Sequence, residues 1–169
     1  MKQKIENVIF KVPERLYIKT IISTLNRFEK ESLDDADFIN FVLNTFYHLR
    51  NYDKIYIIKY VHSWVNNHLT YKEDQYDETL ISPRQMINLM EGDCDDFSVF
   101  IKTILKCFNI ETKYILLGKE YNDYSHIALI YSTSTVTNAV AVARKLIYID
   151  GIVSEFDVYP ADYIYNKII

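Results

Sequence analysis

The hydrophobic periodicity of this chain changes once, near residue 110. Before that point, apolar residues recur three and four positions apart, as on one face of a helix. After it, segments such as SHIALIYS (125–132) and RKLIYIDG (144–151) read as strands. No repeat, low-complexity tract or Gly/Ser-rich linker divides the sequence. Helices followed by an antiparallel sheet define the α+β class, so the sequence predicts a single α+β domain over residues 1–169.

Helices are predicted over three long segments of the first half: residues 13–30, 35–51 and 53–69. A shorter helix is expected from Ser82 to Met90, because serine is a good N-cap and proline suits the first helical position. The polar residues 70–82 interrupt the pattern. In the second half, residues 133–143 predict a hairpin loop or extended strand tips. Residues 157–169 predict a strand or turn with a short helix.

Composition excludes several classes of function. The chain has 19 basic and 23 acidic residues and no dense Lys/Arg stripe, which argues against a nucleic-acid surface. No apolar run approaches the roughly 20 residues needed to cross a bilayer, and the N-terminus is too polar for a secretory signal. We therefore expect a cytoplasmic protein that binds neither nucleic acid nor membrane. Abundant Ile, Lys, Asn and Tyr, which have AT-rich codons, hint at a bacterial or phage genome. If the genome is that of a phage, a role as a component of the virion is an alternative.

The clearest helix begins directly after Gly92. Asp93 is a natural N-cap, and Asp95 and Asp96 fall in the first turn, where carboxylates suit the positive end of the helix dipole. Cys94 therefore occupies the first helical position. The rest of this helix carries a continuous apolar face: Phe97, Phe100, Ile101, Ile104, Leu105 and Phe108.

A cysteine at a helix N-terminus is a candidate nucleophile. The helix dipole lowers the pKa of the thiol, and the backbone N–H groups there can face a developing oxyanion. No candidate acid or base accompanies Cys107 in the sequence, so this residue is expected to be structural. On one helix the two cysteines would lie about 20 Å apart, too far for a disulfide, which fits a reducing compartment.

A base and an orienting acid are expected with such a nucleophile. His48, His62 and His68 stand among surface-like residues in the helical half, whereas His126 begins a predicted strand. Asp150 ends another strand, before Gly151. Two neighbouring antiparallel strands could bring His126 and Asp150 side by side, with Cys94 on a helix packed across them.

These residues resemble the transglutaminase-like branch of the papain-like cysteine enzymes, in its bacterial and phage form. The resemblance is carried by Ser82-Pro83, by the GDCDDF element (92–97), by SHIA (125–128) and by YIDG (148–151). Tyr71 and Asp74 also fit. It covers roughly residues 60–152. It implies a papain-like fold, with the transglutaminase core over residues 56–169 and a helical extension over residues 1–55.

The resemblance also implies roles for the site residues. Cys94 would be the nucleophile, His126 the general base and acid, and Asp150 the orienting acid, with Asp157 as a fallback for Asp150. A thioester would form on an amide of a protein or peptide substrate and pass to water or to an amine. The second oxyanion donor stays open among three residues: Trp64, Tyr71 and Gln85.

Other readings of the same residues stay open. Asp93, Asp95 and Asp96, with the acidic residues 71–78, could bind Ca²⁺, although no EF-hand spacing is present. No CxxC or paired-histidine motif indicates zinc, and we expect neither a metal nor a cofactor. The runner-up function is a structural or assembly module on the same fold, with a protein partner bound through the N-terminal helices.

Overall fold

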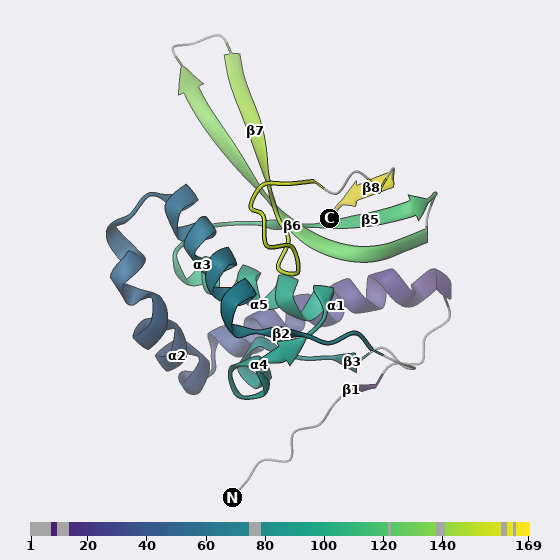
Figure 1. The fold of residues 1–169 in the computed structure, drawn as a ribbon, viewed down its shortest axis with the longest axis horizontal. Helices are drawn as coiled ribbons and strands as arrows, with labels where there is room; N and C mark the ends of the chain where they lie inside the picture. Colours follow the sequence, from purple (N-terminus) through teal and green to yellow (C-terminus); the bar gives the residue numbers. More distant parts are fainter. Residues whose placement is uncertain are drawn as a thin grey trace, which may run out of the picture.

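The computed structural model describes residues 8–9, 14–74, 79–121, 123–137, 141–159, 162–163 and 165–169. Figure 1 shows a layer of helices below a twisted antiparallel sheet, which is the predicted α+β architecture. The helices are α1 (Glu14–Leu33), α2 (Ala36–Phe46), the 3-10 helix η1 (Tyr47–Asn51), α3 (Lys54–His68), α4 (Pro83–Leu89) and α5 (Cys94–Cys107). None of the described helices is long and apolar enough to cross a membrane.

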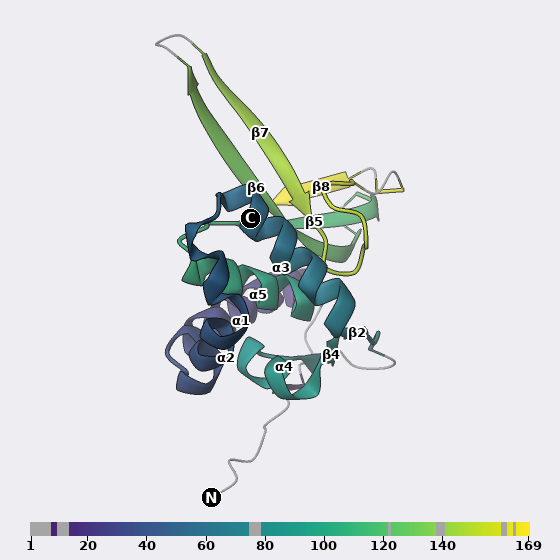
Figure 2. The same cartoon turned by 60° about the vertical axis from the view of Figure 1, so that its left-hand side comes forward.

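The main sheet has the strand order β7-β6-β5-β8, with antiparallel neighbours throughout. Its strands are β5 (Lys113–Glu120), β6 (Asp123–Thr137), β7 (Ala141–Ile149) and β8 (Tyr165–Ile168). Strands β6 and β7 stay paired as far as Thr137 and Ala141, so the extended-tip alternative is correct for residues 133–137 and 141–143. Figure 2 shows this hairpin projecting from the rest of the domain.

Helix α5 is the central element of the helical layer. It packs against α1, α3 and α4 on its helical side and against β6 of the sheet. Its apolar face is buried, as the spacing predicts, because Phe97, Phe100, Ile101, Ile104 and Leu105 are each at most 2% exposed. The end of α5 that carries Cys94 is therefore held from several directions.

The polar segment 70–82, for which the sequence predicts no regular structure, contributes one strand to each of two short pairs. Strand β2 (Thr70–Tyr71) runs parallel to β4 (Glu91–Gly92), and β1 (Val8–Ile9) pairs antiparallel with β3 (Thr79–Leu80). Two-residue strands give no periodicity in the sequence, so tertiary pairing alone defines them. The β2–β4 pair borders the start of α5, because β4 ends two residues before Cys94.

The C-terminal segment differs in part from the prediction. Its expected strand is β8, but its described residues, 157–159, 162–163 and 165–169, contain no helix. Ile115, Leu117, Ala128, Ile130 and Tyr148 form a second cluster on the outer sheet face, with Tyr163 packed against it. The segment thus covers the sheet face opposite α5.

Candidate active site

The sharp approach of the chain to α5 explains the glycines of the GDCDDF and YIDG motifs. A Cβ added at Gly92 would lie 2.8 Å from Cβ of Asp96, and one at Gly151 would lie 2.8 Å from Cβ of Phe97. Such distances are far shorter than van der Waals contact. Both glycines therefore let backbone pass directly over the first turns of α5.

Asp93 and Asp96 build the N-terminus of α5. Asp93 is the N-cap, in extended conformation, and its backbone N–H donates to Oδ2 of Asp96 at 3.3 Å. The N–H of Ile81 donates to Oδ1 of the same carboxylate at 2.6 Å. Cys94 is thus the first residue of the helix, as predicted, and Asp96 ties the preceding loop to it.

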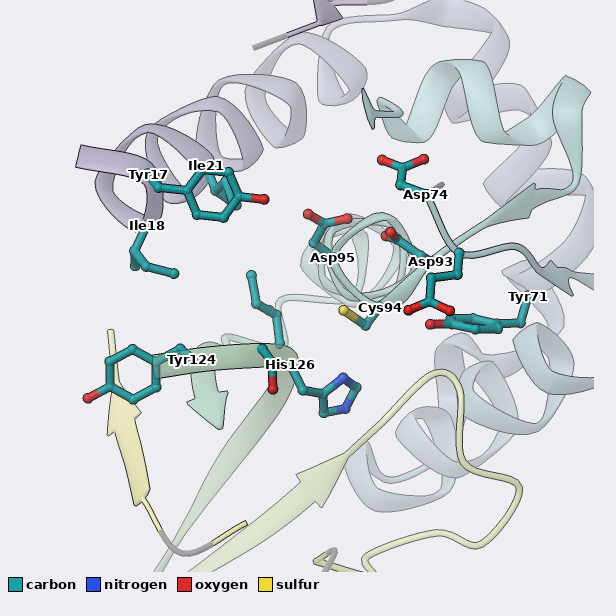
Figure 3. Close-up of a pocket in the computed structure, with 13 residues that line it drawn as sticks. Tyr17, Ile18, Ile21, Tyr71, Asp74, Asp93, Cys94, Asp95, Tyr124 and His126 are labelled. Atoms are coloured by element: carbon teal, nitrogen blue, oxygen red, sulfur yellow. The ribbon is translucent and has the colours of Figure 1, made fainter. Parts of the chain in front are cut away.

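Cys94 and His126 line the same cavity, which has a volume of about 200 Å³. Figure 3 shows the Cys94 side chain, from α5, beside the His126 ring, from β6. The Ser98 hydroxyl lies 2.7 Å from the Cys94 carbonyl oxygen and 3.1 Å from that of Ile127. This hydroxyl links the turn that carries the cysteine to the strand that carries the histidine.

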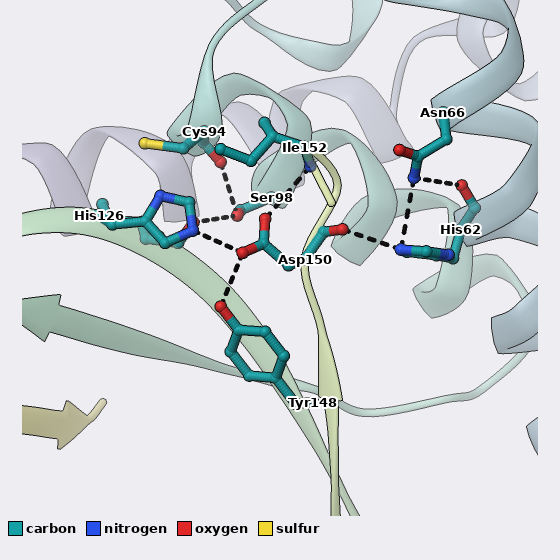
Figure 4. Close-up of polar contacts among 9 residues, drawn as sticks. His62, Asn66, Cys94, Ser98, His126, Tyr148, Asp150 and Ile152 are labelled. Atoms are coloured by element: carbon teal, nitrogen blue, oxygen red, sulfur yellow. Dashed lines mark hydrogen bonds and ion pairs between the residues drawn. The ribbon is translucent and has the colours of Figure 1, made fainter. Parts of the chain in front are cut away.

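The Asp150 carboxylate lies against the His126 ring. Nε2 of His126 is 2.6 Å from Oδ2 of Asp150, and both side chains are buried. The other ring nitrogen of His126 faces the Cys94 side in Figure 4. The structure therefore brings together the three residues that the sequence singles out.

Two more groups hold the Asp150 carboxylate. The Tyr148 hydroxyl donates to Oδ2 at 2.7 Å, and the backbone N–H of Ile152 donates to Oδ1 at 3.2 Å. Burial alone would raise the pKa of Asp150, but these bonds and the contact with His126 together hold the pKa below its ordinary value. Asp150 therefore stays ionised in a dry environment.

The other candidates occupy other places. Asp157 accepts a hydrogen bond at its Oδ1 from the backbone N–H of Tyr148 at 3.0 Å, so this oxygen binds the backbone of β7. Gln85 accepts hydrogen bonds from the N–H and hydroxyl of Ser82 at the start of α4. Trp64 stacks on His68 and packs in the aromatic core with Phe41. Of the three oxyanion candidates, Tyr71 is the one that lines the cavity with Cys94.

His62 is buried, so the prediction that it lies among surface residues is wrong. It is 2% exposed, and its Nε2 donates to the backbone carbonyl of Asp150 at 2.9 Å. Burial lowers the pKa of His62 despite that bond, so a neutral ring holds the backbone of Asp150. The sequence contained a signal for this, because His62 continues the apolar stripe of Ile58, Val61 and Val65.

Carboxylates crowd the other side of Cys94. Asp93, Asp95 and Asp96 each offer an oxygen within 4.8 Å of the other two. Asp95 is 3% exposed and Asp93 9%, and Oδ1 of each has no hydrogen-bond partner. Burial, followed by contact with the neighbouring carboxylates, raises the pKa of Asp95 well above its ordinary value, and burial with the charge of Asp93 does so for Asp96.

Comparison with known proteins places this chain in a family. A sequence model of the transglutaminase-like superfamily matches residues 49–146, more than half of the chain. The chain therefore belongs to the transglutaminase-like superfamily. A comparison with curated proteins finds no match.

Solved structures of LapG from Legionella pneumophila share the fold. One is 17% identical to this chain, with a TM-score of 0.54 over 78% of this chain and 73% of LapG. A calcium-bound LapG is 16% identical, with the same TM-score over 78% of this chain and 75% of LapG. An EGTA-treated form of LapG also matches. This likeness confirms the predicted transglutaminase-like α+β fold.

The raised pKa values of Asp95 and Asp96 predict how stability depends on pH. Because these carboxyls bind protons more tightly in the folded state than in the unfolded state, stability falls as pH rises above the unfolded pKa of about 3.9. In metal-free buffer, the stability of the wild type relative to Asp95→Asn should therefore increase as pH falls from about 8 to about 5.

Chemical denaturation of both variants at several pH values measures this difference. Comparing the two cancels the opposite effect of His62, which is common to both. Asp37→Asn is the control, because it removes an exposed carboxyl group that lies outside the cluster beside Cys94. A wild-type advantage over Asp95→Asn that stays constant from pH 8 to 5 would contradict the raised pKa of Asp95.

Proposed function

We propose that this protein is a cysteine hydrolase or acyl transferase that acts on amide bonds of proteins or peptides. The observation that carries the proposal is the contact of Nε2 of His126 with Asp150 at 2.6 Å, on a ring that shares a cavity with Cys94. Membership of the transglutaminase-like superfamily and the LapG-like fold support a cysteine peptidase-type function.

Each group has a defined role in the first step. The Cys94 thiolate attacks the amide carbonyl carbon, and the carbonyl oxygen takes the negative charge. His126, protonated when it accepted the thiol proton, gives this proton to the leaving amine as the C–N bond breaks. Asp150 fixes the ring orientation and stabilises its positive charge. The product is a thioester between Cys94 and the acyl group.

The second step decides between hydrolysis and transfer. Water activated by His126 releases a carboxylic acid, whereas an amine forms a new amide and leaves a crosslinked or modified product. Both outcomes use the same three residues. The walls of the cavity therefore set the outcome through the access they give to each acceptor.

The α1 helix contributes one of these walls. Tyr17, Ile18 and Ile21 line the cavity opposite the acidic residues Glu73 and Asp74. Figure 3 shows the labelled α1 side chains facing Cys94 across the opening. We assign to this helix, which precedes residue 49 where the family match begins, the role of narrowing the substrate cleft.

The proposal predicts cleavage or amine transfer that depends on one cysteine alone. A peptide library from a digested proteome is incubated with the protein, with and without a labelled primary amine, and new termini are identified by mass spectrometry. New termini or labelled glutamines should appear with the wild type and with Cys107→Ser, and disappear with Cys94→Ser.

Cys107→Ser is the matched control because it is the other thiol of the same helix, at an exposed position. Products that persist in Cys94→Ser would contradict the nucleophile assignment. A wild type that yields no product, although its fold is intact, would favour the structural or assembly role.

We also propose that the carboxylates beside Cys94 bind a calcium ion. LapG is known in a calcium-bound form. In this chain, the cluster of three carboxylates offers oxygen ligands of the kind that calcium binds. Oxygen donors suit Ca²⁺, and the buried Oδ1 atoms of Asp93 and Asp95 have no hydrogen-bond partner. Asp93, Asp95 and Asp96 would hold the ion. Once bound, it would offset negative charge that otherwise disfavours the Cys94 thiolate.

Calcium should therefore stabilise the fold through these residues. At a 100-fold excess over its Kd, the ion should add about 2.7 kcal/mol of stability, raising Tm by roughly 5–10 °C over an EGTA-treated sample. Asp95→Asn should lose most of this shift, and Asp37→Asn should keep it. An identical Tm in EGTA and in millimolar calcium would contradict the site and favour a proton shared between Asp93 and Asp95.

A further inference from the structure

Attack of Cys94 on the substrate places negative charge on the carbonyl oxygen. A single backbone N–H at the start of α5 would give this oxyanion only one hydrogen bond. Oxyanions in acyl-transfer enzymes are stabilised by preorganised hydrogen-bond donors aimed at the position the oxygen takes. The N-terminal turn of α5 presents N–H groups at Cys94. A second donor must come from another element that borders the cavity at the same end of that helix.

We propose that the Tyr71 hydroxyl is this second donor, an inference that rests on the proposed function. The backbone around Tyr71 is fixed relative to Cys94. Tyr71 on β2 pairs with Gly92 on β4, and the N–H of Lys72 donates to the Gly92 carbonyl oxygen at 2.8 Å. Gly92 lies two residues before the nucleophile, so this pairing sets the spacing between tyrosine and cysteine.

The ring of Tyr71 is oriented by the helix that carries the nucleophile. It packs edge-on against Phe97, with ring centroids 6.4 Å apart and an interplanar angle of 83°. Figure 3 shows the hydroxyl end directed toward Cys94. Tyr71 is also 47% exposed, so the cavity side of the ring is accessible to a substrate.

The electrostatics keep this hydroxyl a donor. Burial, then the negative charges of Cys94 and Asp93, raise the pKa of Tyr71 to about 12. The phenol therefore holds its proton throughout the neutral range and gives a hydrogen bond without releasing the proton. The same negative charges disfavour a phenolate, which excludes Tyr71 as the base that activates the thiol.

Tyr163, another tyrosine near the site, has a different place. Tyr163 stacks on the His126 ring, with centroids 5.6 Å apart and an interplanar angle of 16°, and its hydroxyl bonds with Ser125. It thus supports the imidazole from the C-terminal segment. Tyr71 approaches from β2, on the Asp93 side of the cysteine, where it borders the cavity.

Two reagents separate oxyanion stabilisation from thiol reactivity. p-Nitrophenyl acetate acylates Cys94: the Sγ–C bond forms through an oxyanion, and nitrophenolate leaves. Iodoacetamide alkylates the same sulfur by displacing iodide, with no oxyanion. All variants carry Cys107→Ser, which leaves Cys94 as the sole thiol, and Cys94→Ser in the same background gives the blank rate. Single-turnover acylation and alkylation rates are measured at one neutral pH.

Tyr71→Phe should lower the acylation rate by about 100-fold while its alkylation rate stays within about twofold of the parent. Tyr121→Phe, which removes a hydroxyl at a 75% exposed position, is the control and should change neither rate. Circular dichroism of each variant establishes that the fold is retained.

Three results would overturn the assignment. Equal acylation rates in Tyr71→Phe and its parent would show that the hydroxyl does not stabilise the oxyanion. An equal fall in both rates would show that Tyr71 acts on the thiol instead. A parent that alkylates rapidly but acylates no faster than the Cys94→Ser blank would remove the proposed function itself, and this inference with it.

Discussion

The site depends on how closely backbone segments approach the first two turns of α5. Gly92 and Gly151 lie where any Cβ would collide with Asp96 or Phe97, so the strand before Cys94 and the turn after Asp150 both pass directly over the helix. This contact sets the separation of Cys94 and Asp150. A larger residue at either position would push one of the two partners away from His126.

The same end of the helix holds opposing electrostatic demands. The helix dipole and His126 favour a thiolate at Cys94, whereas three carboxylates within 4.8 Å of one another oppose it. Asp96 satisfies two backbone amides and builds the loop, but the unpaired oxygens of Asp93 and Asp95 have no such structural use. Proton uptake, or the calcium binding proposed above, would relieve this crowding and would make the reactivity of Cys94 depend on pH or on calcium concentration.

The acid side of the site is supported through several layers. Tyr148 and the Ile152 amide hold the Asp150 carboxylate, and His62 from α3 holds its backbone carbonyl. Because α3 also packs on α5, Asp150 and Cys94 are held by the same packed helices. Small shifts of α3 would therefore alter the orientation of His126 without any change in the residues that react.

Local patterns were enough to predict most of this arrangement. The N-cap, the dipole position of Cys94 and the apolar face of α5 follow from short-range rules, and the order of Cys94, His126 and Asp150 follows from the motifs. The β2–β4 pair that positions Tyr71 could not be predicted, because two-residue strands leave no period. The prediction for His62 is wrong although the residue lies on an apolar stripe, because a histidine in a polar helix is expected to face solvent.

The central claim is that Cys94 is a nucleophile activated by its helix and by His126. Labelling of the native protein with iodoacetamide at about pH 6 and pH 8.5, with the two cysteines quantified separately by mass spectrometry, tests it most directly. Cys107, at the other end of the same helix, is the internal reference. The account predicts rapid labelling of Cys94 at pH 6 in the wild type, little labelling of Cys107, and slower labelling of Cys94 in His126→Ala. A Cys94 that is inert at pH 6 and no faster than an ordinary thiol at pH 8.5 would contradict it.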